Sequence, residues 1–184
     1  MYAHLQSFRH LALLGLAALT AACSDGGDTT APVASAEAIA FRPDHTMGSG
    51  SSSTLLGRAT FSDGENLKVK RMTGDWHVEV KAHRELDIAV QQIVFQPGGY
   101  SGWHSHPGPV FIQVVSGTMT FYDSTDPTCT PIVRTVGQGF LDVGDHAHIA
   151  RNETSSPAVN VVTYLAPPGA ALRIDEPAPG NCPF

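Results

Sequence analysis

The sequence has few charged residues and no cluster of basic ones. Charged side chains make up 15% of its 184 residues, and the formal net charge is −6. A basic face that would bind nucleic acid through its phosphates is therefore not expected. The sequence also has no convincing helical period over about ten residues, which argues against long amphipathic helices.

No apolar segment is long enough to cross a bilayer comfortably. The segment from Leu11 to Cys23 follows Arg9 and His10 and ends in small residues, a pattern typical of a secretory signal peptide. Its end, LTAAC, resembles a bacterial lipobox, although Thr20 stands where lipoboxes favour leucine. We therefore predict a lipoprotein signal peptide at 1–22 and lipidation of Cys23. The alternative is an ordinary signal peptide cut near the same place.

Apolar periodicity is also missing from the next stretch. Residues 23–54 are rich in Ser, Asp, Gly, Thr and Ala, as in SDGGDTTAPVASAEA and GSGSSS. This composition predicts a flexible tether. The protein is then expected to be exported and lipid-anchored in the bacterial cell envelope or periplasm, with no membrane contact beyond the anchor.

Cysteine is scarce. The sequence has three cysteines, and lipidation or removal of Cys23 leaves Cys129 and Cys182. An even pair in an exported protein predicts a disulfide, which would stabilise the fold by about 4 kcal/mol on the chain-entropy model. The alternative is two unpaired thiols, which an oxidising compartment disfavours. Neither cysteine has a histidine or another cysteine nearby in sequence, so a thiolate metal site is not expected.

Glycine and proline, by contrast, are frequent. The 18 glycines and 13 prolines separate short apolar runs, as expected for many strands joined by turns. Residues 55–184 are therefore predicted to form a single all-β domain, either a sandwich or a barrel. Within it, Ser116 and Gly117 form a predicted two-residue hairpin turn between VFIQVV and TMTFY.

Two His-x-His pairs are the features that suggest chemistry. His104 and His106 form the first pair, and His146 and His148 form the second. Residues i and i+2 of an extended strand point to the same side, so both rings of a pair can face one point. If the two strands are neighbours in a barrel, the imidazoles can converge on a metal ion.

Both histidine segments resemble the motifs of the cupin superfamily. The first motif is matched by Gly98, His104, His106 and Gly117, and the second by Gly137, His148 and Asn152. The second motif's proline and later glycine are replaced by Val143 and Asp145. The resemblance implies a small double-stranded β-helix, or jelly-roll barrel, with a metal inside one end.

The resemblance implies His104, His106 and His148 as metal ligands, and it places Val110 where the family's glutamate ligand would stand. Three neutral imidazoles leave a divalent ion with both its charges. We therefore expect a centre that is more cationic, and has more open coordination positions, than one with a glutamate ligand as well. His146 is a fourth candidate metal ligand. The alternatives are that it donates a hydrogen bond to one of the metal ligands, or that it is an exposed loop residue. Gln113 is a poor substitute because strand parity points it away from Val110.

Three acids are further candidates for contact with a ligand histidine, with solvated loop charges as the default: Asp87, Asp142 and Asp145.

The expected cofactor is one divalent transition metal, with iron first and zinc, manganese, nickel or copper as alternatives. The favoured function is metal binding at a three-histidine centre of the cupin kind, ranked above any particular reaction. Dioxygenase-like chemistry on a small chelating substrate is the first reaction considered for that centre, and hydrolysis is less favoured. The alternatives are a non-catalytic module that binds a metal or small ligand at the cell surface, and a metal-free interaction domain. A homodimer is expected only by analogy with other cupins.

Overall fold

The structure is a computed structural model that describes residues 46–62 and 67–184. The predicted signal peptide at 1–22, Cys23, and residues 23–45 of the predicted tether lie outside the described residues. Within the described part of the chain there are twelve strands and no helix, which confirms the all-β prediction. No helix in that part is therefore long and apolar enough to cross a membrane.

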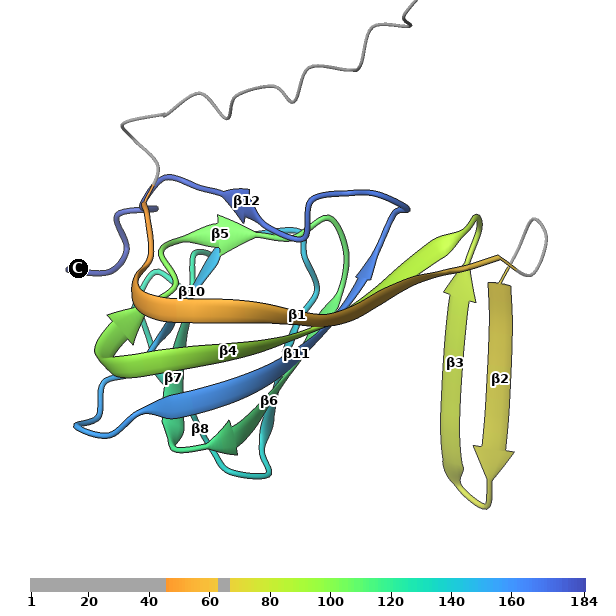
Figure 1. Ribbon diagram of the computed structural model, residues 1–184, viewed down its shortest axis with the longest axis horizontal. Helices are drawn as coiled ribbons and strands as arrows, with labels where there is room; N and C mark the ends of the chain where they lie inside the picture. The colour runs from red at the N-terminus through yellow and green to blue at the C-terminus, as the bar shows by residue number, and fades with distance from the viewer. Residues whose placement is uncertain (1–45, 63–66) are drawn as a thin grey trace, which may run out of the picture. The chain divides into compact units, whose positions relative to one another are not determined.

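All strand pairs are antiparallel, and ten of the strands described form one sheet that curls into a nearly closed barrel (Figure 1). One wall is built on β4 and β11, with β1, β6 and β9 beside them, and the other on β10, with β5, β7, β8 and β12. The bounds are β1 (Ser49–Phe61), β2 (Leu67–Thr73), β3 (Trp76–Ala82), β4 (Leu86–Tyr100), β5 (His104–Ser105), β6 (Val110–Ser116), β7 (Thr118–Asp123), β8 (Ile132–Thr135), β9 (Gly139–Asp142), β10 (His148–Arg151), β11 (Ala158–Ala166) and β12 (Ile174–Asp175).

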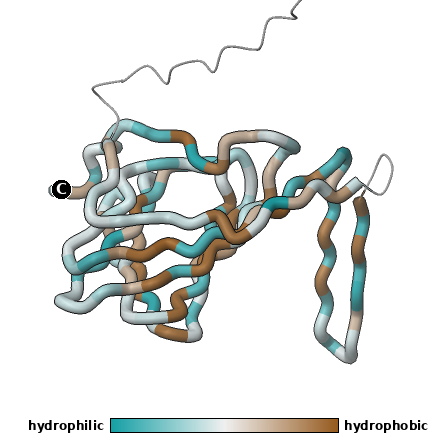
Figure 2. The backbone as a smooth tube through the Cα atoms, in the orientation of Figure 1, coloured by the Kyte–Doolittle hydropathy of each residue, from teal (hydrophilic) through white to brown (hydrophobic). Residues whose placement is uncertain are grey.

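The core lies between the two walls. Along β6, buried Val110, Ile112 and Val114 alternate with exposed residues, as the period of two requires. Along β11, buried residues alternate with half-buried ones, and Figure 2 shows hydrophobic and hydrophilic residues alternating along the barrel strands. Phe121 of β7 stacks on Phe140 of β9, with ring centroids 4.4 Å apart, so the walls also contact each other through aromatic rings.

β2 and β3 form a separate two-stranded sheet, with Leu67 paired to Ala82 at one end and Thr73 to Trp76 at the turn. Trp76, Val78 and Val80 share one face of β3, as the sequence alternation predicts, and all three are exposed.

The predicted boundary between tether and domain differs from the structure. Residues 49–54 belong to β1, where Ser51 pairs with Phe95 and Thr54 with Gln92 of β4. β1 is exposed along its whole length, so it joins the sheet through its backbone and needs no apolar alternation. The Gly/Ser-rich composition of residues 49–54 therefore did not predict the strand that they form.

The predicted hairpin at Ser116 and Gly117 is wrong. β6 pairs with β11 and β9, whereas β7 pairs with β10 and β8, so the chain crosses here from one wall to the other. Gly117 has a φ of 74°, and a Cβ at this position would lie 2.8 Å from the Pro157 carbonyl oxygen. The glycine permits a close backbone crossing instead of a two-strand turn.

The structure joins Cys129 and Cys182 in a disulfide across 53 residues of sequence, as the cysteine count predicts. Both half-cystines pack beside Trp103, Tyr122 and Ile149, a small apolar cluster behind the first histidine. The bridge therefore attaches the C-terminal segment to the wall that carries the histidines.

Candidate metal centre

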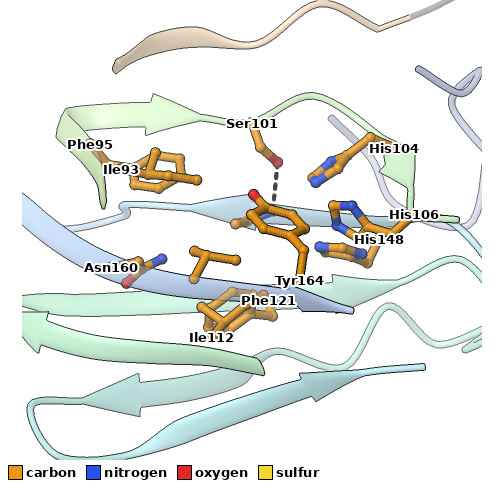
Figure 3. Close-up of a pocket in the computed structure, with 12 residues that line it drawn as sticks. Ile93, Phe95, Ser101, His104, His106, Ile112, Phe121, His148, Asn160 and Tyr164 are labelled. Atoms are coloured by element: carbon orange, nitrogen blue, oxygen red, sulfur yellow. Dashed lines mark hydrogen bonds between the residues drawn. The ribbon is translucent and has the colours of Figure 1, made fainter. Parts of the chain in front are cut away.

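Three of the four candidate histidines come together inside one end of the barrel. His104 begins the short strand β5, His106 follows that strand, and His148 begins β10. β5 and β10 are paired, with His148 directly opposite His104. Each of the three residues offers one ligand atom such that all three atoms lie within 4.8 Å of one another. Figure 3 shows the three rings gathered at one end of the interior.

The three rings are close and almost completely buried. Their centroids are 4.4 Å apart between His104 and His148, 4.9 Å between His104 and His106, and 5.2 Å between His106 and His148. Their exposed fractions are 7% for His104, 5% for His106 and 1% for His148. Three buried imidazoles at this spacing form a preorganised set of nitrogen donors.

Backbone carbonyls orient two of these rings. Nδ1 of His104 lies 2.9 Å from the Gly102 carbonyl oxygen, and Nδ1 of His106 lies 2.6 Å from that of Leu172. A carbonyl can only accept, so each Nδ1 carries the proton and donates it. Nε2 of both rings then keeps its lone pair, which is the arrangement that metal-binding histidines use.

Burial keeps these two rings neutral at pH 7. It lowers the pKa of His104 well below the ordinary 6.5, and nearby His148 and Arg173 lower it further. Burial and nearby His148 also lower the pKa of His106, to about 4, against the opposing effects of the Leu172 carbonyl and Asp142. A neutral imidazole is the form that binds a metal ion.

His146, the fourth candidate, does not join the cluster. Its Nε2 lies 2.8 Å from Asp123 Oδ2, and its Nδ1 contacts Asp145 Oδ1. Burial lowers its pKa, but the two carboxylates outweigh this effect and leave the pKa above 6.5. β10 begins only at His148, so the turn before it directs His146 away from the site despite its two-residue spacing.

Val110 faces the interior, and a carboxylate lies on the strand next to it. Asp142 of β9 is the register partner of Val110, and its side chain is 1% exposed. Its Oδ2 lies 2.9 Å from His148 Nδ1 and 3.7 Å from His106 Nε2. Oδ2 and Nδ1 are not aligned as a hydrogen bond, and neither has another partner among the described residues.

Asp142 is ionised at neutral pH. Burial raises its pKa, but His148, the Gly144 backbone N–H and His106 outweigh burial and hold the pKa below the ordinary 3.8. The buried charge therefore lies against two of the three clustered histidines.

The other two candidate acids lie elsewhere. Asp87 is bound to Arg58 and Thr60 of β1, and the carboxylate of Asp145 is exposed beside His146. Gln113 is exposed, as its strand parity predicts.

Asn152, the last residue of the second motif, has a structural role. Its Nδ2 donates to the carbonyls of Phe95, Gln96 and Ser156, and its Oδ1 accepts from Thr154. These bonds fix the turn between β10 and β11 against β4. The residue thus holds the wall that carries His148 without contacting the histidines.

A cavity of about 30 Å³ adjoins the three histidines, with room for one or two water-sized molecules. Its other polar lining residues are Ser101, Asn160 and Tyr164, which sequence reasoning did not single out. Alternation along β11 could have found Asn160, because it shares a parity with Ala158 and Val162. Burial raises the pKa of Tyr164 to about 12, and its hydroxyl donates to Gln91 Oε1.

The donor set fits a transition metal ion. Imidazole nitrogens suit iron, zinc, copper and nickel. The deprotonated forms that binding requires are present in His104 and His106, and an anionic Asp142 is at hand to accept from a ligand ring.

No family model matches the sequence, and no curated protein matches it. Among solved structures, a double-stranded β-helix protein from Klebsiella pneumoniae is 20% identical, covers 62% of this chain and 88% of that one, and has a TM-score of 0.41. A Cupin_2 domain of a transcriptional regulator from Enterobacter cloacae is 24% identical over 44% of this chain and 82% of its own, at a TM-score of 0.36. The polyketide cyclase RemF from Streptomyces resistomycificus is 10% identical over 73% of this chain and 82% of its own, at a TM-score of 0.46.

These identities and TM-scores are low, so no activity, metal or substrate is transferred from these proteins. The fold is cupin-like on its own evidence: the antiparallel barrel, and the positions of the two histidine segments on its paired strands β5 and β10.

Proposed function

We propose that this protein binds one divalent transition metal through His104, His106 and His148, at the cell envelope, and uses it for dioxygenase-like chemistry on a small chelating substrate. The observation that supports the proposal is the cluster of three buried imidazoles, whose ligand atoms lie within 4.8 Å of one another. Iron is the first expectation among the metals that such a donor set accepts, followed by zinc, manganese, nickel and copper.

A bound metal of this kind polarises its ligands and, if it is redox-active, supplies electrons for reaction with dioxygen. The protein's own residues orient and shield it. The carbonyls of Gly102 and Leu172 hold the Nδ1 protons of two rings, so that Nε2 is available for binding. Phe95, Phe121 and neighbouring aliphatic side chains line the cavity and exclude bulk water from it.

A second candidate function is non-catalytic binding of a metal or small ligand at the cell surface. One observation favours it: the described residues that line the cavity include no carboxylate. Tyr164, with a pKa of about 12, stays protonated at neutral pH and cannot act as a general base there. Chemistry would then depend on the metal and its bound ligands alone.

Metal content tests the proposal common to both functions. We expect the purified full-length protein to retain about one transition metal ion per chain, measured by inductively coupled plasma mass spectrometry. His104→Ala and His148→Ala should each lose most of it, because each removes a donor. His83→Ala is the matched control, since His83 is exposed and should leave the metal content unchanged. A wild-type protein that binds no metal after incubation with each candidate ion would refute the proposal.

Oxygen consumption separates the two functions. The metal-loaded protein would be supplied with diketones, catechols and thiols in turn, while dissolved oxygen is recorded. Consumption that requires both substrate and His148 supports the dioxygenase. Tight metal binding without any consumption across the panel supports the binding module.

A further inference from the structure

Hydrogen bonds of the turn after β9 satisfy only one of the two carboxylate oxygens of Asp142. Asp142 ends β9, and its Oδ1 accepts a 2.9 Å hydrogen bond from the Gly144 backbone N–H. That bond satisfies one oxygen and shapes the following turn. Oδ2 has no aligned hydrogen-bond partner among the described residues, although its side chain is 1% exposed.

A buried carboxylate needs a cation or several hydrogen-bond donors nearby. The ion-pair contacts of Asp142 among the described residues are with His148 and His106 alone, and no lysine or arginine is among them. A histidine that binds a metal ion does so in its neutral form, which supplies no full positive charge. A divalent ion held by these histidines would supply it.

The position of Asp142 in the barrel matches the substitution at residue 110. Val110 of β6 stands directly opposite Asp142 of β9, so the two side chains occupy neighbouring places on the inner surface. The cupin motif has a glutamate where Val110 stands in this sequence. The carboxylate in this protein thus comes from the adjacent strand.

We propose, building on the metal centre above, that Asp142 is a positioning residue that replaces the missing glutamate without binding the metal. Its Oδ2 lies 2.9 Å from Nδ1 of His148, close enough to accept the Nδ1 proton once the two groups turn into line. That bond would fix the ring with Nε2 toward the metal. The carboxylate also cancels one of the ion's two charges. The centre is therefore less cationic than the valine at position 110 alone would suggest.

Asp142→Asn tests this role. The amide oxygen can still accept from Gly144, but the amide nitrogen in place of Oδ2 cannot accept from His148. We expect a 10- to 100-fold increase in the dissociation constant for Zn²⁺, roughly the effect of losing an outer-sphere partner, measured by competition with a chelator. The double variant Val110→Glu with Asp142→Asn should recover most of the affinity, because it returns a carboxylate to the opposite strand.

Asp87→Asn is the matched control, a second buried aspartate whose partners are Arg58, Thr60 and Gly169 and no histidine. It should leave the Zn²⁺ affinity unchanged. If Asp142→Asn folds and binds Zn²⁺ within about twofold of wild type, well below the expected loss, Asp142 serves only the turn and the inference is wrong. If wild type itself binds no Zn²⁺ or other ion, the proposed function fails instead, and the two failures are distinguishable.

The wild-type protein provides a test that does not depend on the variant folding. In the Zn²⁺-loaded, ¹⁵N-labelled protein, long-range ¹H–¹⁵N spectra of the histidine rings report which nitrogen holds the metal and which the proton. We expect His148 to bind zinc through Nε2 and to carry a proton on Nδ1. Zinc on Nδ1 of His148 would overturn the inference, because Asp142 could not then accept from that atom.

Discussion

Asn160 lies inside the barrel with 2% of its surface exposed, and its Oδ1 has no hydrogen-bond partner among the described residues. An unpaired buried carbonyl oxygen costs stability. Asn160→Leu, with the same branching at Cγ, should therefore raise the free energy of unfolding by about 1 kcal/mol, measured by urea denaturation. The substitution should also lower the affinity for any polar ligand that binds in the cavity beside the histidines. A loss of stability would mean that the amide has a partner, such as water, in the folded protein.

The Asp87 carboxylate accepts hydrogen bonds from β1 and from the loop after β11. Thr60, the Gly169 backbone N–H and Arg58 lower its pKa from the ordinary 3.8 to about 2. A pKa lowered by folding contributes stability above pH 3.8 that is lost as the pH falls through 2. Asp87→Asn should thus have a lower urea midpoint than wild type at pH 7, and the difference that depends on the charge should shrink at pH 3 and disappear only below pH 2. An equal difference at all these pH values would contradict this assignment.

At the scale of single elements, the disulfide is the one covalent link between the C-terminal segment and the loop after β7 in the described structure. Replacing both Cys129 and Cys182 by serine frees a loop of 53 residues in the unfolded chain. We expect the free energy of unfolding to fall by about 4 kcal/mol on the chain-entropy model. Urea denaturation of wild type with and without reductant provides the comparison, and reduced wild type should match the double variant.

The segment before β1 and the first residues of β1 also contribute to stability next to the site. Thr46 Oγ1 accepts from the Trp103 backbone N–H, and its own N–H donates to the Glu176 carbonyl, beside His104. A chain that begins at residue 55 loses these bonds and the pairing of residues 51–54 with β4. Its unfolding free energy should be lower than that of a chain beginning at residue 46, by about 2 kcal/mol or more. Equal stability would restore the predicted boundary at residue 54.

At the scale of the whole molecule, export and anchoring stay predictions of the N-terminal sequence. Expressed with its own leader in a bacterium, the protein should fractionate with membranes and incorporate labelled palmitate. Cys23→Ser should lose both properties, because the lipid is attached to that thiol. A wild-type protein found unlabelled in the soluble fraction would favour the ordinary signal peptide. A homodimer also stays a prediction, and light scattering of the purified domain checks it.

Local periodicity was sufficient to determine much of this protein. Alternation along β3, β6 and β11 predicts strands, and along β6 and β11 it also identifies the inward residues, because side chains of a strand alternate between two faces. The same parity excludes Gln113 from the site. The spacing of the cupin motifs then predicted that His148 lies with His104 and His106. The two His-x-His pairs by themselves do not indicate which histidine of the second pair joins the first.

Only the tertiary structure decided which of several equivalent residues contribute to the site. His146 and His148 have the same parity, but the turn before β10 directs the His146 ring away from the cluster, where it contacts Asp123 and Asp145. Asp142 was one of three candidate acids in the sequence, with a solvated loop charge as the default, and the β6–β9 register brings it beside His148. β1, rich in glycine and serine, pairs through backbone groups that every residue carries. The reason is common to all three: contacts between distant strands depend on register and turn geometry, and neither leaves a local period in the sequence.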